Sequence, residues 1–371
     1  EEIIMKKILI NYIGKSGGGP AFALEFAKGL ALNGCEVYAV MSEFVDNRKS
    51  WDCCELIKDV YYVKTNEFRG KKYYVKAQLE FILTGKRKLK RYFKDIEFDY
   101  VITTMQHLWS LDVSKLVNAK KIVWICHDPI PHSGSGKMDT YLGNKFAKIA
   151  DETIVLTKSF VPVVSQRWGI SEKHIHFMPH GRQKMYNQYE LGKTENFDEN
   201  INFLFFGYLR EYKGLRILAR AFKIIHQKYK NVTLTIAGSG NFDAYKSEFE
   251  DINDVFVNNR YIADDEVGKF FSKDNLVVVM PYLDATQSGV SLTAMEFGAV
   301  IIASDTGGLK EQLDDGKIGL YCEPGNVDSL VEQMEKVITN SEIFTIENEK
   351  MKRYLDNLEW DKVTKKMLDE I

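Results

Sequence analysis

The sequence predicts an α/β protein made of two Rossmann-like, doubly wound domains that face one another across a cleft. The chain has 371 residues, a length that suits two domains of ordinary size. Short apolar runs alternate with helical segments in two successive series, as in repeated βαβ units. A polar stretch at 182–200, rich in Gln, Asn, Glu and Lys, separates the two series and predicts an interdomain linker.

The first series begins with the apolar run 7–13, which ends in a glycine-rich loop and precedes a helix at 20–33. Such a run is typical of a strand that is buried on both faces of a parallel sheet. Further strands are expected at 36–40, 100–103, 121–126 and 152–156, and in the second series at 203–206, 232–237, 275–280 and 300–304. We therefore place the first domain at 1–185 and the second at 186–345.

Composition excludes several classes of protein. Lys and Arg number 50 against 52 Asp and Glu, so the overall charge gives no support for a surface that binds duplex nucleic acid. The five cysteines have no C-x-x-C spacing, and no histidine pair has the spacing of a zinc-binding helix, so we expect no metal site and no disulfide framework. The sequence shows no apolar run long enough to span a membrane and no signal-peptide pattern, so we expect a cytoplasmic protein.

The glycine loop 14–20 follows a strand and opens a helix. Its backbone N–H groups and the helix dipole can hold an anion, which favours close approach to a phosphate or a sugar. A Walker A loop would need glycine at position 9, where Leu9 stands. The alternative is a flexible turn without a ligand.

A polar pair, His127 and Asp128, follows the strand at 121–126. Ligands of open α/β sheets bind outside the carboxyl ends of the strands, so His127 is placed to meet a sugar hydroxyl or a developing charge. The alternative is a core histidine with satisfied hydrogen bonds, with Asp128 holding the next turn.

Two cations, Arg210 and Lys213, lie in the loop 207–214 after the first strand of the second series. Arg offers a fork of donors and Lys a point charge, and preorganised cations lower the barrier to departure of a diphosphate. The alternative is a solvated loop with ordinary charges. Farther along the chain, small polar residues at 281–288 lead into a helix whose first N–H groups can bind a phosphate.

In this order and spacing the motifs resemble glycosyltransferase family 4, and the resemblance covers nearly the whole chain. The segments that carry it are the glycine loop, His127-Asp128, 179–181, 207–214, 236–240, 281–298, 303–308 and 323–326. The resemblance implies a GT-B fold and a retaining transferase that uses a nucleotide-sugar, UDP- or GDP-linked, without a metal or another cofactor. It also implies that the first domain binds the acceptor, that the second binds the donor, and that a C-terminal helix at 346–371 crosses back to the first domain.

The resemblance also assigns roles to residues. Arg210 and Lys213 would bind the diphosphate, and His127 would contact the donor sugar near its reacting carbon. The donor-binding set that it implies is Gly17, Gly18, Gly238, Arg260, Tyr261, Gln287, Ser288, Gly289, Val290 and Glu296. The backbone around Arg260 and Tyr261 would meet the base.

The sequence departs from the family pattern at three places. Many members carry two glutamates eight positions apart, where this chain has Ala285 and Thr293. Glu296 lies one helical turn after Thr293, and we expect it to reach the ribose, since residues i and i+3 share a helix face. The alternative is that Glu296 only balances charge on that helix. The family arginine that usually follows the glycine is replaced by Tyr208, with Arg210 nearby. These departures leave the donor sugar open.

The stretch 69–94 is basic and aromatic, and it predicts peripheral contact with anionic lipid at the inner face of the membrane. The alternative is a solvated charged face. Binding of single-stranded nucleic acid has no support from the rest of the chain.

The expected acceptor is a glycan or a polyprenyl-diphosphate-linked glycan of a bacterial capsule, O-antigen or exopolysaccharide.

Two other functions fit two facing α/β domains. A sugar-nucleotide epimerase of the GT-B fold would need a set of carboxylates in the cleft for acid–base chemistry, which Ala285 and Thr293 weaken. A two-lobed sugar-binding protein without catalysis would be exported and would have little use for Arg210 and Lys213 together.

Overall fold

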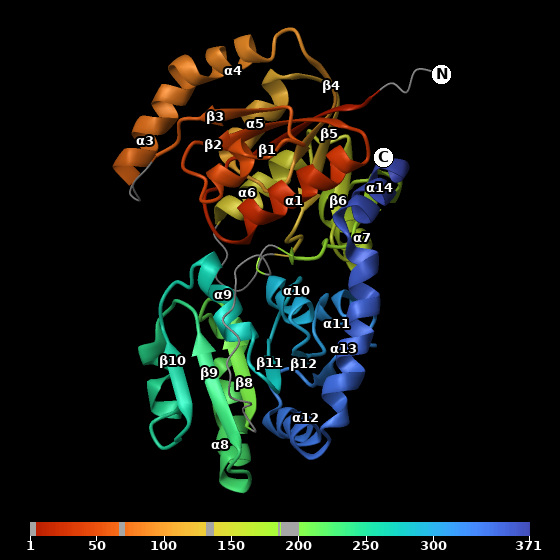
Figure 1. The fold of residues 1–371 in the computed structure, drawn as a ribbon. Coiled ribbons are helices and arrows are strands. Elements are labelled where there is room, and N and C mark those ends of the chain that lie inside the picture. Colours follow the sequence, from red (N-terminus) through yellow and green to blue (C-terminus); the bar gives the residue numbers. More distant parts are fainter. Residues whose placement is uncertain (1–4, 67–70, 131–136, 185, 187–199) are drawn as a thin grey trace. The chain divides into compact units, whose positions relative to one another are not determined.

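The computed structural model describes residues 5–66, 71–130, 137–184, 186 and 200–371. It divides into two compact units, one formed by Glu1–Gly181 with Leu358–Ile371 and the other by Arg182–Asn357. Each unit has its own parallel sheet with helices on its faces (Figure 1). The predicted fold class of two Rossmann-like α/β domains is therefore confirmed.

The first unit contains a seven-stranded sheet in the order β3-β2-β1-β4-β5-β6-β7. Its strands are β1 (Lys7–Tyr12), β2 (Glu36–Ser42), β3 (Asp59–Val63), β4 (Glu97–Thr103), β5 (Asn118–Cys126), β6 (Glu152–Val155) and β7 (Ile175–Phe177). Its helices are α1 (Gly18–Leu32), α2 (Arg48–Asp52), α3 (Lys71–Glu80), α4 (Lys86–Tyr92), α5 (Leu108–Leu116), α6 (Lys137–Phe146), α7 (Val161–Trp168) and α14 (Trp360–Glu370). A π-helical turn, Phe81–Gly85, joins α3 to α4.

Alternate residues of β1 face different layers of helices. Ile8 and Ile10 are buried with residues of α1 and α14, whereas Leu9 between them is buried with residues of α3, α4 and α5. Side chains of a strand point to opposite faces in turn, so an all-apolar strand needs cover on both sides. This is the physical reason that the run 7–13 predicts a sheet wound on both faces.

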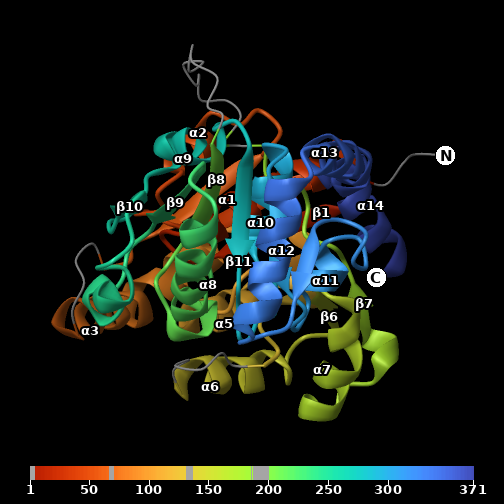
Figure 2. The same cartoon turned by 90° about the horizontal axis from the view of Figure 1, so that it is seen from below.

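The second unit contains a six-stranded sheet in the order β10-β9-β8-β11-β12-β13. Its strands are β8 (Ile201–Phe206), β9 (Val232–Ala237), β10 (Val255–Asn258), β11 (Leu276–Met280), β12 (Val300–Ser304) and β13 (Leu320–Cys322). Its helices are α8 (Leu215–Lys228), α9 (Asp264–Phe271), α10 (Gly289–Glu296), α11 (Leu309–Gln312), α12 (Val327–Thr339) and α13 (Glu342–Leu355). Helices α8 and α12 lie side by side over one face of this sheet (Figure 2).

Short 3-10 turns connect several of these elements. They occupy Lys158–Phe160, Glu172–His174, Glu211–Lys213, Phe242–Ala244, Lys246–Glu248 and Asp356–Leu358. The turn Glu211–Lys213 carries Lys213, one of the two predicted diphosphate ligands.

The C-terminal segment differs from the single helix that we expected at 346–371. Helix α13 belongs to the second unit, where the Glu347 carboxylate accepts a hydrogen bond from the backbone N–H of Gly319 at 2.6 Å. Only α14 belongs to the first unit, where the side-chain amide of Asn33 on α1 donates to the carbonyl oxygen of Asp361 at 2.7 Å. The segment that returns to the first unit therefore begins at Leu358.

In the part of the chain that the structure describes, no helix combines the length and the apolar character that crossing a bilayer requires.

Candidate active site

The predicted diphosphate-binding lysine lies at the carboxyl ends of the strands of the second unit. Lys213 follows β8, and its Nζ donates to the hydroxyl of Tyr282, 3.2 Å away. The Tyr282 hydroxyl lies 3.4 Å from Oγ of Ser288, the residue that precedes α10. Among the described residues, no carboxylate pairs with Lys213. A neutral phenol therefore holds this cation beside the start of a helix.

Arg210 lies on the same loop and is exposed to solvent. Its guanidinium forms neither a hydrogen bond nor an ion pair with any residue that the structure describes. The acid between the two cations contacts other partners: Glu211 lies 3.6 Å from Nε of Arg216 and accepts a hydrogen bond from Tyr245 at 3.3 Å. The loop therefore carries two positive charges that no acid of the described residues pairs with.

Two glycines allow the loops of this site to meet. A Cβ on Gly238, which follows β9, would lie 1.9 Å from the carbonyl oxygen of Gly207 at the end of β8. A Cβ on Gly214, which follows Lys213, would lie 1.8 Å from the carbonyl oxygen of Pro281 at the end of β11. Both glycines have a positive φ, 145° and 70°, that disfavours a side chain. Gly238 therefore shapes the site by allowing close backbone contact.

The start of α10 presents backbone donors beside Lys213. Ser288 is the N-cap residue, but its side chain caps no backbone N–H. The N–H groups of Gly289 and Val290, in the first helical turn, have no acceptor within the helix. Gln287, half-buried, precedes the N-cap residue Ser288. Free N–H groups and the positive end of a helix dipole together favour a phosphate.

Gln183 is a site residue that the sequence reasoning missed. The hydroxyl of Thr293, at the place of a family glutamate, lies 3.0 Å from Oε1 of Gln183 and 3.1 Å from the carbonyl oxygen of Gly289. Nε2 of Gln183 lies 3.3 Å from the position that a Cβ on Gly289 would take. The side-chain amide therefore lies over the first turn of α10. Its signal in the sequence is weak, since it only follows the motif 179–181 by two residues.

Glu296 is engaged by another residue, which corrects the expectation that it reaches the ribose. Its two carboxylate oxygens accept hydrogen bonds from Nε and Nη2 of Arg182, at 2.6 and 2.8 Å. Only 1% of the Glu296 side chain is exposed. A buried, bidentate pair of this kind leaves the carboxylate without a free face, so the structure does not support a ribose contact.

Arg260 and Tyr261 lie between β10 and α9. The Arg260 guanidinium donates to both carboxylate oxygens of Glu266, each at 2.7 Å, so its charge is already paired. Tyr261 is half-exposed. The Arg260 guanidinium is therefore already engaged, and contact of the backbone of this segment with a base stays a prediction.

The glycine loop of the first unit leaves room for a ligand. Gly17 is the N-cap residue of α1, and no side chain caps this helix end. Gly17 and Gly18 are exposed, and a Cβ on either would meet no atom within 4 Å. The predicted anion-binding end of α1 is thus open.

His127 is held as a neutral donor at the end of β5. Its Nε2 lies 2.8 Å from the carbonyl oxygen of Thr104, so this nitrogen carries the proton and donates it. Burial lowers the pKa of His127, and neighbouring Asp128 offsets this only in part. Burial also lowers the pKa of His180, to about 4. Both rings contact Phe22 on α1, with ring centres 4.8 and 5.0 Å away.

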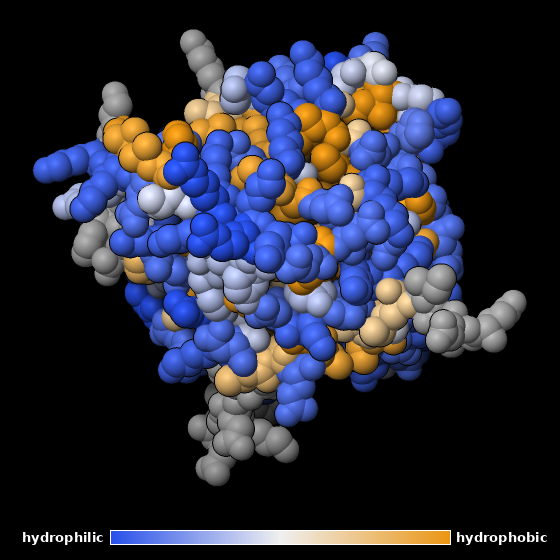
Figure 3. Space-filling model, turned by 90° about the horizontal axis from the view of Figure 1, so that it is seen from above, coloured by the Kyte–Doolittle hydropathy of each residue, from blue (hydrophilic) through white to orange (hydrophobic). Residues whose placement is uncertain are grey.

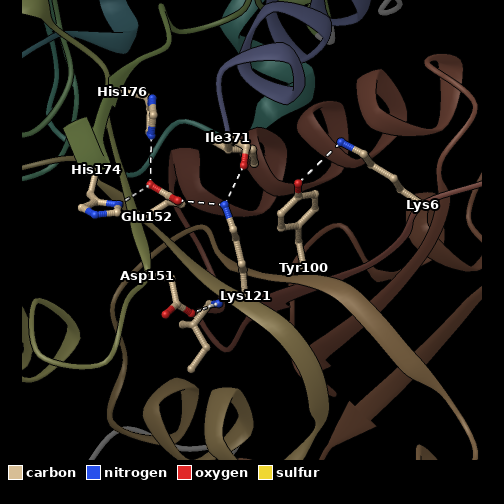
Figure 4. Close-up of polar contacts among 9 residues, drawn as sticks. Lys6, Tyr100, Lys121, Asp151, Glu152, His174, His176 and Ile371 are labelled. Atoms are coloured by element: carbon tan, nitrogen blue, oxygen red, sulfur yellow. Dashed lines mark hydrogen bonds and ion pairs between the residues drawn. The ribbon is translucent and has the colours of Figure 1, made fainter.

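A second polar cluster lies at the amino ends of the strands, away from these loops (Figure 4). Glu152 at the start of β6 accepts hydrogen bonds from Lys121, His174 and His176, at 2.9, 3.2 and 3.0 Å. Lys121 also donates to the carbonyl oxygen of Ile371 at 2.8 Å. Three donors thus share this carboxylate, and the described residues include no group of three acidic, His or Cys ligands arranged to hold a metal ion.

Comparison with known proteins shows that both halves of the chain match glycosyltransferase family models. Residues 16–183 match the family model for Glycosyltransferase Family 4, and residues 200–340 match the model for Glycosyl transferases group 1. An uncharacterized glycosyltransferase of Haemophilus influenzae is 24% identical over 346 residues, which cover 92% of both chains. A lipopolysaccharide 1,2-N-acetylglucosaminetransferase of Salmonella typhimurium is 21% identical over 201 residues, or 49% of this chain and 53% of that protein.

Among solved structures, the crystal structure of Anabaena HepE in complex with UDP and glucose superposes with a TM-score of 0.73. The two sequences are 17% identical, and the superposition covers 98% of each chain. This similarity concerns the fold.

Proposed function

The chain belongs to glycosyltransferase family 4, and we propose that it moves a sugar from a nucleotide-sugar to a glycan or lipid-linked acceptor, with retention of configuration. The observation that carries this proposal is the positive charge of Lys213 beside the start of α10, with Arg210 on the same loop and neither cation paired with an acid among the described residues. A nucleoside diphosphate that departs from the sugar gains negative charge. Cations and N–H groups that are already in place stabilise that charge without rearrangement.

Each part of the donor receives a partner in this proposal. Lys213 and Arg210 bind the diphosphate, and the N–H groups of Gly289 and Val290 bind phosphate or sugar oxygens together with Gln287 and Ser288. Backbone at 260–261 meets the base. These protein cations supply the charge that a divalent metal supplies elsewhere, so the proposed reaction needs no metal.

The first unit supplies the remaining contacts in this proposal. Gly17 and Gly18 hold the donor phosphate or the acceptor through the start of α1. His127 contacts the donor sugar as a neutral group, since its proton lies on the nitrogen that donates to Thr104. No carboxylate of the described site is placed as a nucleophile, so we propose attack by the acceptor hydroxyl on the face that the diphosphate leaves.

The relatives support a role in bacterial surface polysaccharide. The Salmonella typhimurium relative is named for transfer to lipopolysaccharide. HepE was solved with UDP and glucose, which makes UDP-sugars the first donors to test, followed by GDP-sugars.

Thermal unfolding in the presence of UDP-, GDP-, dTDP- and ADP-sugars, without added metal, tests donor binding. A ligand that binds only the folded state raises the unfolding midpoint by mass action. We expect one base to give a clear rise that is lost in Arg210→Ala and Lys213→Ala. Arg353→Ala is the matched control, because Arg353 is an exposed arginine of the same unit whose ion pair with Glu349 lies on the surface of α13. A response that survives in both site variants would contradict the assignment.

A membrane surface is the second partner in this proposal, and the basic arm, residues 72–94, carries it. The arm has eight Lys and Arg residues against one Glu. Its inner side packs on the unit, where Phe81 stacks on Trp109 with ring centres 4.7 Å apart. Its outer side exposes the apolar residues Val75, Leu79, Ile82 and Leu83, of which Leu83 is 65% exposed. Residues 69–70 of the predicted stretch lie outside the described residues.

This pattern suits a helix that lies on a lipid surface. Figure 3 shows apolar side chains exposed among hydrophilic ones on the side where Figure 1 places α3. Apolar residues enter the boundary between headgroups and acyl chains, and flanking Lys and Arg are attracted to anionic lipid, as on the inner leaflet.

Co-sedimentation with vesicles tests the membrane contact. We expect binding to phosphatidylglycerol-containing vesicles and little binding to pure phosphatidylcholine. A Leu79→Ser/Leu83→Ser variant should lose it, whereas Leu32→Ser, which changes an exposed leucine on α1, should not. Equal loss in both variants, or no binding by the wild-type chain, would remove the membrane from the proposal.

A further inference from the structure

Three residues of α10 form a stripe along one face of the helix. Gly289, Thr293 and Glu296 are spaced by four and three positions, so they lie above one another on that face. The chain segment that opens the second unit lies along this stripe. Arg182 binds Glu296 at the end of the helix, and Gln183 contacts Thr293 and the first helical turn. Gln183 therefore lies beside the end of α10 that carries the free N–H groups.

The Thr293 hydroxyl sets the orientation of the Gln183 amide. This hydroxyl donates to Oε1 of Gln183 at 3.0 Å. Nε2 then points toward the start of α10, where it lies 3.3 Å from the position that a Cβ on Gly289 would take. Gly289 is exposed, so a ligand can reach this point, whereas only 4% of Thr293 is exposed. Thr293 thus acts on the amide and does not face the open side of the site.

The N–H groups of the Gln183 amide have bonding capacity left. Among the residues that the structure describes, none accepts a hydrogen bond from Nε2. Gln183 is half-buried, so its amide has lost part of its hydration while one side stays open. Hydrogen bonds to a charged partner contribute more than those to a neutral one. The amide therefore gains most from an anionic oxygen.

The groups that share this helix start favour a phosphate. The Lys213 ammonium binds the hydroxyl of Tyr282, which in turn lies 3.4 Å from Oγ of the N-cap residue Ser288. The carboxylate that α10 itself carries, Glu296, is bound by Arg182 at the opposite end of the helix. A cation, free backbone N–H groups and the positive end of the helix dipole together attract an anion to the place that Nε2 faces.

We propose that Gln183 binds a phosphate oxygen of the donor nucleotide through Nε2, and that Thr293 is the positioning residue that aims it. This inference rests on the proposed function, because it adds a residue to the diphosphate site of that proposal. Thr293 then serves the donor indirectly, by orienting an amide that lies 110 residues away in the chain.

Isothermal titration calorimetry on the whole chain tests the proposal, with UDP, GDP, dTDP and ADP as probes. For the diphosphate that binds the wild type, we expect Gln183→Ala to raise Kd at least about tenfold, as loss of a hydrogen bond to a charged group does. Gly289→Ala keeps the backbone N–H but places a methyl group against Nε2, so it should raise Kd by a smaller factor. The double variant should bind no more weakly than Gln183→Ala, because the methyl group then has no amide to displace.

Two substitutions of Thr293 test its positioning role. Thr293→Val removes the hydroxyl that aims the amide and should weaken binding of the same diphosphate, whereas Thr293→Ser keeps the hydroxyl and should bind normally. The matched control is Gln227→Ala, which changes an exposed glutamine on α8 of the same unit and should leave Kd unchanged. The unfolding midpoint of each variant is measured without ligand, because a purely structural role would lower the midpoint and leave the Kd of the folded variant unchanged.

The variant Gln183→Glu separates binding from support of the fold. Its carboxylate still accepts from the Thr293 hydroxyl but offers no N–H to a phosphate, so we expect it to bind at least as weakly as Gln183→Ala. Unchanged Kd in Gln183→Ala, wild-type binding by Gln183→Glu, or equal weakening in Gln227→Ala would overturn the inference. The proposed function survives these results if Lys213→Ala still loses binding. A wild-type chain that binds none of the diphosphates, or binding that persists in both Arg210→Ala and Lys213→Ala, would defeat the proposed function and this inference with it.

Discussion

Replacing Glu296 distinguishes a structural carboxylate from one that binds ribose. In Glu296→Gln, Arg182 loses a bidentate partner whose side chain is 1% exposed, while its own side chain is 16% exposed. Removing one member of a buried ion pair costs about 3–5 kcal/mol. Asp356, 3.8 Å from Arg182 and 74% exposed, offers partial compensation, so we take the lower value of about 3 kcal/mol. In a unit of the size of Arg182–Asn357, that loss lowers the unfolding midpoint by about 6–12 °C.

Differential scanning calorimetry and donor kinetics on the same samples provide the assay. We expect a lower midpoint for the second unit, with the KM for the nucleotide-sugar changed little at a temperature where the variant is folded. An Arg182→Met/Glu296→Leu double variant should recover much of the stability, because it leaves no unpaired buried charge. An unchanged midpoint with a large rise in donor KM would refute this reasoning and return Glu296 to the ribose.

Three further results are expected. Burial raises the pKa of Glu152, but hydrogen bonds from Lys121 and two histidines outweigh it, and the net pKa is lowered from 4.5. The charged Glu152 carboxylate therefore stabilises the fold above its unfolded pKa, and this stabilisation is lost as pH falls through the lower folded pKa. Below about pH 5, the urea midpoint of the wild type should fall more steeply with pH than that of Glu152→Gln. Parallel curves of urea midpoint against pH would contradict this. Gly214→Ala should lower both stability and kcat, because the new Cβ would meet the carbonyl oxygen of Pro281 and the residue would be held at a positive φ. Circular dichroism melts and initial rates measure the two effects. A fully active and equally stable variant would contradict this prediction. Because burial lowers the pKa of His127, the kcat of the wild type should show no inflection from this group between about pH 6.5 and 8; an inflection there that His127→Gln removes would show that the group titrates.

The inner strands of both sheets could be predicted from the sequence, but the edge strands could not. The sequence analysis found every inner strand of both sheets and missed the four edge strands, β3, β7, β10 and β13. The inner strands are apolar runs because both their faces are buried. The edge strands are short and partly exposed: β10 has no buried residue, and β7 and β13 have one each. A strand that is covered incompletely carries too few apolar residues to produce the pattern.

The position of a predicted site residue could be inferred from the sequence where that residue lies in a loop after a strand. Arg210 and Lys213 lie in the loop after β8, the start of α10 follows the loop after β11, and parallel strands end at the same edge of a sheet. The hydrogen-bond partner of Glu296 could not be predicted in this way. Spacing along a helix shows which residues share a face, but the partner that takes the carboxylate, Arg182, lies 114 residues away in the chain. Gln183 escaped notice for the same reason, because only the folded chain brings it to Thr293.

The positive charge beside α10 persists because nearby acids have cations of their own. Glu211 stands between Arg210 and Lys213 in the sequence, yet its carboxylate lies against Arg216. Glu296, on α10 itself, is taken by Arg182. The pair of Glu211 is largely exposed, so it adds at most about 1 kcal/mol to stability. Its larger consequence is electrostatic, because a carboxylate that turned toward Lys213 would offset the positive charge on which the proposed diphosphate contact depends. Arg182 and Arg216 therefore keep two nearby carboxylates away from the charge of Lys213.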